Sequence, residues 1–257
     1  MNKKILTHAA LILVFGLLPA AAHDFVLTSG TDADEQTTVS GLYGHPGAWE
    51  TPDLRRLIAL DVHTSDKDES VSLLDKVTVA KASSLKLLAP VAELKDKGNV
   101  AISAVYDNGF WVATKEGKYY STTKKEASGL ISVEKSSHNM KFAKVLIRGK
   151  DKMIGQRLEI VLQKAPSDLA AGAKLPVKVI FDGKALEAAE LAIVSLDGVL
   201  NHDTPGIKAD AQGNAELPIE KTGAHVIRVS HDVPSKNVEL ADIDSFSATL
   251  VFDATRN

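Results

Sequence analysis

The chain has 257 residues, of which 44 % are hydrophobic and 25 % are charged, the composition of a folded globular protein. Its 30 lysines and arginines stand against 33 aspartates and glutamates, and this net charge of −3 does not favour nucleic-acid binding. Cysteine is absent, which excludes disulfides, thiolate metal sites, iron–sulfur clusters, thiol nucleophiles and a lipid-anchored cysteine. Aromatic residues are only 5 %, so a surface that stacks on sugars or bases is not expected.

The first 22 residues have the pattern of a secretory signal peptide. Lys3 and Lys4 form a basic start, residues 9–18 are an unbroken apolar run, and Pro19 and three alanines follow. The run is too short for a membrane span of about twenty residues. Cleavage after Ala22 leaves small residues at the cut, so we expect a mature chain that begins at His23 with a net charge of −5. We expect a periplasmic protein without stable membrane insertion.

Short β-rich segments separated by turn formers fill the first half of the mature chain. The sequence Asp107-Asn108-Gly109 between two of them predicts a hairpin turn. Residues 115–125 are typical of a solvated hairpin, and Ser136–Lys144 fits either a strand or a helical turn. The predicted strands are Glu35–Tyr43, Arg56–Thr64, Lys76–Lys81, Ala101–Tyr106 and Gly109–Thr114.

A polar break at residues 148–152 separates these strands from a second series. The second series is Leu158–Gln163, Leu175–Phe181, Ala189–Ser195, His225–Ser230 and Ser245–Phe252, with turns at 182–184, 197–198 and 210–213. This spacing predicts an all-β protein with two β-sandwich domains, 23–152 and 153–257, of which the C-terminal one is Ig-like. One long sandwich with insertions is the alternative.

Because cysteine is absent, the histidines are the main candidate metal ligands of this sequence. At a mature N-terminus, His23 offers an α-amine and a ring nitrogen that can chelate one ion, and such nitrogen pairs suit Ni(II) and Cu(II). His45, held in a loop between Gly44 and Pro46, is a candidate third ligand. The alternative for His23 is a terminus that frays in solvent.

His231, just past a predicted strand, is the outer candidate for the metal site. The remaining histidines have no assigned role. His63 ends a strand, His138 shares a strand face with Met140, His202 lies in a turn and His225 lies within a strand.

No catalytic signature is present in the sequence. The Gly-x-Ser-x-Gly elbow, His-Glu-x-x-His, the P-loop and the dinucleotide fingerprint are all missing. We therefore expect a binding protein rather than an enzyme.

Several segments in fixed order resemble the periplasmic components of nickel and cobalt uptake systems, formerly a domain-of-unknown-function family. The resemblance runs through Ala22-His23-Asp24-Phe25, Gly44-His45-Pro46, residues 155–161 (GQRLEIV), residues 172–184, residues 210–214 and residues 248–252. The later segments also look like prealbumin-like or carboxypeptidase-regulatory sandwiches, which implies a prealbumin-like C-terminal domain. His225 stands where the family often has Trp.

The resemblance implies a periplasmic binding protein for a divalent transition metal, Ni or Co first and possibly Cu or Zn, which delivers the ion to a membrane importer. His23, His45 and His231 would be its ligands, and binding should weaken below about pH 6 because imidazole must be neutral to coordinate. Two alternatives remain open. One is a copper protein or copper monooxygenase that uses the His23 chelate, and the other is a metal-free structural β-sandwich.

Overall fold

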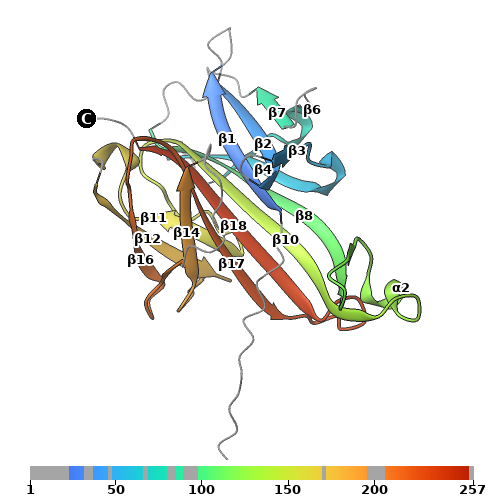
Figure 1. Ribbon diagram of the computed structural model, residues 1–257. Helices are drawn as coiled ribbons and strands as arrows, with labels where there is room; N and C mark the ends of the chain where they lie inside the picture. The colour runs from blue at the N-terminus through green and yellow to red at the C-terminus, as the bar shows by residue number, and fades with distance from the viewer. Residues whose placement is uncertain are drawn as a thin grey trace, which may run out of the picture.

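The computed structural model describes residues 23–31, 37–45, 48–65, 69–79, 85–88, 98–169, 172–195 and 206–254, and the predicted leader lies outside them. The protein is all-β (Figure 1). Its described strands form three sheets, of nine, five and four strands. Among the described residues, no helix has the length and hydrophobicity needed to cross a bilayer.

The nine-stranded sheet forms the middle of the molecule. Its order is β15-β14-β17-β18-β10-β8-β4-β5, with β9 paired to β8. Two long strands, β10 and β18, pair in parallel, which joins the earlier and later parts of the chain in one sheet. The strands are β4 (Leu57–Thr64), β5 (Val71–Ser72), β8 (Val100–Thr114), β9 (Tyr119–Tyr120), β10 (Val133–Arg148), β14 (Glu190–Ser195), β15 (Ile207–Lys208), β17 (Gly223–Pro234) and β18 (Ile243–Ala254).

The two smaller sheets pack on opposite faces of the central sheet (Figure 1). The five-stranded sheet has the order β1-β2-β7-β6, with β3 paired to β2, and the four-stranded sheet has the order β11-β12-β13, with β16 paired to β12. The first contains β1 (Asp24–Thr31), β2 (Thr37–His45), β3 (Ala48–Glu50), β6 (Val77–Val79) and β7 (Leu85–Leu88). The second contains β11 (Leu158–Leu162), β12 (Lys174–Phe181), β13 (Lys184–Ala185) and β16 (Asn214–Pro218).

Short helical turns join some of these strands. They are the 3-10 turns η1 (Leu54–Arg56), η2 (Leu74–Lys76) and η3 (Pro166–Asp168), and the four-residue helix α2 (Lys124–Ala127). A capping box begins α2, in which the Thr123 side chain accepts from the backbone of Glu126 and the Glu126 side chain accepts from the backbone of Thr123.

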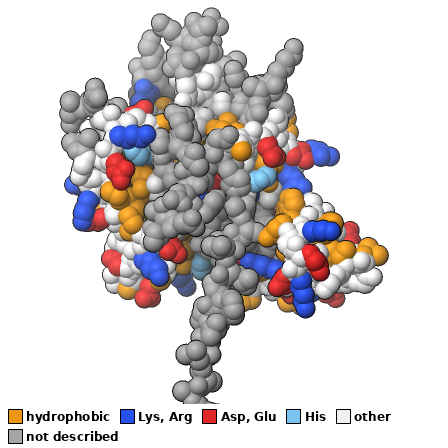
Figure 2. All heavy atoms as spheres, viewed as in Figure 1, with side chains coloured by type: hydrophobic (Ala, Val, Ile, Leu, Met, Phe, Trp, Pro, Cys, Tyr) orange, Lys and Arg blue, Asp and Glu red, His pale blue; other side chains and the backbone are white. Residues whose placement is uncertain are grey.

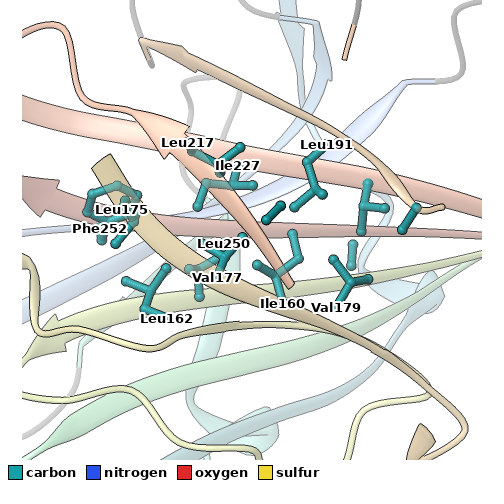
Figure 3. Close-up of a cluster of buried hydrophobic side chains, with 14 of the residues drawn as sticks. Ile160, Leu162, Leu175, Val177, Val179, Leu191, Leu217, Ile227, Leu250 and Phe252 are labelled. Atoms are coloured by element: carbon teal, nitrogen blue, oxygen red, sulfur yellow. The ribbon is translucent and has the colours of Figure 1, made fainter. Parts of the chain in front are cut away.

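Successive side chains of the central strands point to opposite faces of the sheet and thereby contribute to two separate hydrophobic cores. On β18, Leu250 and Phe252 face the four-stranded sheet in what we call the first core, whereas Val251 faces the five-stranded sheet in the second core. On β17, Ile227 and Val226 divide between the two cores in the same way. Figure 3 shows the first core, where side chains of β11, β12 and β16 meet those of β14, β17 and β18.

A buried charge cluster anchors the polar segment that follows β10. The Lys144 ammonium lies 3.0 Å from Asp151 and 3.1 Å from Glu159, and all three side chains are at most 2 % exposed. Glu159 also accepts from the backbone N–H groups of Ile154 and Gly155. The break expected at residues 148–152 is thus a connection between β10 and β11 that is held in place by charge.

One sequence prediction is wrong and one ambiguity is resolved. Residues 107–109 do not make a hairpin turn, because β8 continues through them and carries a β-bulge at Asn108 opposite the Asn139–Met140 step of β10. Gly109 takes a φ of +76°, which this bulge requires and which glycine adopts without strain. Residues 136–144 form part of strand β10.

Candidate functional site

The start of β1 lies against the end of β2, and this pairing brings two predicted ligands together. Asp24 pairs with Gly44 in antiparallel register, so the positions of His23 and His45 come next to each other across the hairpin. On the other side of β2, His45 pairs with Ala48 of β3. Cβ atoms of directly opposed residues in such a ladder lie about 4.5–5.5 Å apart. The side chain of His45 and the whole of Pro46 lie outside the described residues.

The half-buried ring of His23 meets Tyr43, two positions before His45 on the same strand. The two rings are 4.9 Å apart and nearly perpendicular, at 79°. Burial is the main cause that raises the pKa of Tyr43 to about 12, and the nearby Tyr106 raises it further. The phenol therefore stays protonated at any ordinary pH and acts as a hydrogen-bond donor.

Asn108, at the bulge of β8, receives that hydrogen bond and fixes the position of Tyr43. The Tyr43 hydroxyl donates to Asn108 Oδ1 at 2.8 Å. The Asn108 carbonyl accepts from Trp111 Nε1 at 3.0 Å and from Arg56 Nη1. Asn108 is buried, so these bonds satisfy polar atoms that water cannot reach. The bulge therefore ties the end of the β1–β2 hairpin to the central sheet.

Beneath His23, the next residue carries a buried charge. Asp24 is 4 % exposed, and its Oδ2 lies 3.4 Å from Nε of Arg228 on β17. Lys141 of β10 is 2 % exposed and also faces Asp24 and Arg228. Burial lowers the pKa of Lys141 to about 8, Asp24 opposes this decrease, and Arg228 adds to it. The Asp24 carboxylate is thus engaged as a counter-ion for two cations.

The backbone of β1 is also fixed to the central sheet next to this ion pair. The Thr249 hydroxyl of β18 donates to the carbonyl oxygen of Phe25 at 2.7 Å, and the Phe25 ring stacks on Tyr106 at 4.7 Å. The strand that presents His23 is therefore held by an ion pair, a hydrogen bond and a ring contact within two residues of it.

The structure separates His231 from the other two candidates. On β17, Arg228 faces Asp24 and the second core, whereas Val229 and Val233 face the first core. His231 shares the face of Val229 and Val233, and its ring lies 4.5 Å from that of Phe181. The central sheet therefore lies between His231 and His23. The sequence placed His231 near the end of a strand but did not predict which face of the sheet it occupies.

Three further histidines have structural partners of their own. His63 Nε2 lies 2.8 Å from Ser103 Oγ, and burial lowers the pKa of His63. His138 Nε2 lies 2.9 Å from Asp107 Oδ1, and its ring stacks on Phe110. His225 is buried, contacts the Gly223 carbonyl through Nδ1 at 2.8 Å and stacks on Phe252. His202 lies outside the described residues.

Among the described side chains, no group of three His, Asp or Glu residues is close enough to hold a metal ion. The arrangement therefore offers His23 and the backbone position of His45, and the α-amine of a chain that begins at His23 would supply a third nitrogen. Sequence reasoning missed Tyr43, Asn108, Asp24 and Lys141. The Asn-Gly pair at 108–109 indicated an unusual backbone, but the neighbouring residues did not indicate which side chains would bond to Asn108.

A comparison with protein-family models gives a match to most of the chain. The family model described as "Domain of unknown function (DUF4198)" matches residues 20–233. No curated protein matches the sequence. The matched range begins before His23 and includes the β1–β2 hairpin and the bulge of β8.

Proposed function

The chain belongs to the DUF4198 family, and we propose that it is a periplasmic binding protein that takes up a divalent transition-metal ion, nickel or cobalt, at the β1–β2 hairpin and passes it to a membrane importer. The α-amine and ring nitrogen of a mature His23 and the imidazole of His45 are the ligands of this proposal. The metal is cargo, and no catalytic step is involved.

The observation that supports the proposal is the register of the hairpin. Because Asp24 pairs with Gly44, His23, which precedes Asp24, lies next to the position of His45, which follows Gly44. Sequence separation gives no reason for two histidines 22 positions apart to meet, so their juxtaposition is a specific property of this pairing. Nitrogen ligands of this kind suit late first-row divalent ions.

The surroundings favour an open site with few ligands. Tyr43 is a protonated donor committed to Asn108, and the Asp24 carboxylate is committed to Arg228 and Lys141. Neither group is available as an anionic ligand. A site with three nitrogens and free positions can release its ion to a second protein, as delivery to an importer requires.

Nickel and cobalt titration by calorimetry tests the proposal. The mature chain is compared with His23→Ala, His45→Ala and, as the matched control, His231→Ala on the opposite face of the central sheet. We expect a loss of affinity of at least about tenfold, or about 1.4 kcal/mol, in the first two variants and no change in the control. Binding by the mature chain that neither alanine weakens would refute the proposed site, and no binding at all would refute the function.

A further inference from the structure

The long strands of the central sheet project beyond both cores and end in a small protruding knob (Figure 1). We call it the distal tip and define it as residues 115–132, which include β9 and α2, and residues 235–242. Its two segments are joined by a hydrogen bond from Lys124 N to Leu240 O of 2.8 Å and by ion pairs of Lys124 with Asp242 and Lys125 with Glu239. The tip is therefore one ordered unit.

Large apolar side chains are concentrated on the distal tip. Leu130 is 82 % exposed, Val238 62 %, Tyr119 52 % and Tyr120 40 %. These four are half of the eight large hydrophobic side chains that are exposed in the described part of the chain. In Figure 2, apolar side chains and charged ones stand together at the protruding end. A cluster of this kind at the extremity of a folded protein indicates a contact surface.

The charge on the tip differs in sign from that of the whole protein. The tip carries five lysines and four acidic residues, whereas the chain as a whole has a net charge of −3. Lys115 and Lys118 precede the tyrosine pair and are exposed, and the exposed Glu116 lies between them. Two of the acidic residues, Glu239 and Asp242, are paired with lysines, and Glu126 serves the cap of α2. The exposed side chains of the tip therefore include tyrosine, leucine and lysine, and the lysines outside these ion pairs, Lys115, Lys118 and Lys236, outnumber Glu116.

We propose that the distal tip docks reversibly on an anionic phospholipid bilayer. Tyrosine prefers the boundary between hydrocarbon and water, a leucine gains free energy when it enters the acyl region, and lysine pairs with anionic headgroups. A knob that projects beyond the rest of the protein can touch a flat surface without obstruction. The proposal does not depend on metal binding and concerns a different part of the molecule.

Vesicle sedimentation tests this docking. The mature chain is mixed with vesicles of phosphatidylcholine and phosphatidylglycerol, or of phosphatidylcholine alone. We expect binding to the mixed vesicles that decreases at high salt, because surface charge is screened. Tyr119→Ser with Leu130→Ser should weaken it at least about tenfold, and Lys115→Glu with Lys118→Glu should do the same by a separate route.

The matched control is Ile58→Ser with Val71→Ser, two apolar residues on β4 and β5 that are 52 % and 43 % exposed. This variant should bind the mixed vesicles like the parent, and thermal unfolding confirms that each variant is folded. Absence of binding by the parent, or an equal loss in the control, would overturn the proposal. Concentration-dependent self-association that Leu130→Ser abolishes, in the absence of vesicle binding, would assign the tip to a second copy of the chain instead.

Discussion

The hydroxyl of Tyr43 donates to Oδ1 of Asn108 across 2.8 Å, and this bond links the β1–β2 hairpin to the bulge of β8, 65 residues further along the chain. The same tyrosine touches the ring of His23. The position of the proposed metal site therefore depends on an irregularity in a strand of the central sheet.

Tyr43→Phe tests this link. The ring and its contact with His23 are kept, and the donor to Asn108 is lost. We expect a decrease of about 1 kcal/mol in the free energy of unfolding, because Asn108 Oδ1 then keeps only its longer contact with Arg56 Nη1, at 3.4 Å. Urea denaturation measures the change, and Tyr119→Phe at the exposed tip serves as the control. Equal stability of both variants and the parent would show that the bond is of no consequence.

Asp24→Asn should be among the most destabilising single changes in β1. It leaves Arg228 and the buried Lys141 without their shared counter-ion. Breaking a buried pair in this way costs about 3–5 kcal/mol, while the exposed pair of Lys135 and Asp232 contributes less than about 1 kcal/mol. Denaturation of Asp24→Asn beside Asp232→Asn measures both, and similar small losses would contradict the buried arrangement.

Lys141 gives the protein a specific pH dependence. Its pKa is about 8 in the folded protein, below its ordinary value of 10.5, so between these values the unfolded chain binds more protons. The free energy of unfolding should therefore rise with pH between about 8 and 10.5, by an amount on the order of 3 kcal/mol.

Lys141→Met isolates this contribution from that of the other lysines and tyrosines. The difference in stability between parent and variant should move in favour of the parent as the pH increases from 8 to 10.5. Urea midpoints at several pH values measure the difference. A constant difference over this range would mean that the two states bind the proton equally.

The cluster of Lys144, Asp151 and Glu159 should be needed for the connection between β10 and β11. Lys144→Met leaves two carboxylates buried without a cation, at a cost of about 3 kcal/mol or more. Lys174→Met removes the partner of Glu216 in an exposed pair and should change stability by less than about 1 kcal/mol. Equal effects in a denaturation experiment would contradict a structural role for the cluster.

The local sequence pattern predicted a strand well where the strand ends at a turn with characteristic turn residues. The prediction of 175–181 followed by a turn at Asp182-Gly183 matches β12, because both turn residues adopt the positive φ of a tight hairpin, 47° and 76°. The Asn-Gly at 108–109 failed as a turn signal. Arg56 and Tyr43, which are remote in sequence, hold Asn108 within a continuous strand, and neighbouring residues carry no information about them.

The same holds for the candidate site, where the ligand types could be predicted from local sequence but the spatial arrangement could not. The chemistry of His23 and His45 could be read from the residues themselves, but their proximity depends on the register of a hairpin. The position of His231 depends on which face of β17 each residue occupies, and both faces of this strand cover a core. Parallel pairing of β10 with β18, from Ser137 with Ile243 onward, joins segments more than a hundred residues apart.

The most direct measurement for the metal proposal uses the processed chain end itself. Nickel affinity is measured for a chain that begins at His23 and for the same chain with one alanine added before it. The extension keeps both imidazoles and removes the α-amine from the His23 chelate. We predict that the added alanine weakens binding at least about tenfold. Unchanged tight binding by the extended chain would contradict the proposed role of the N-terminus.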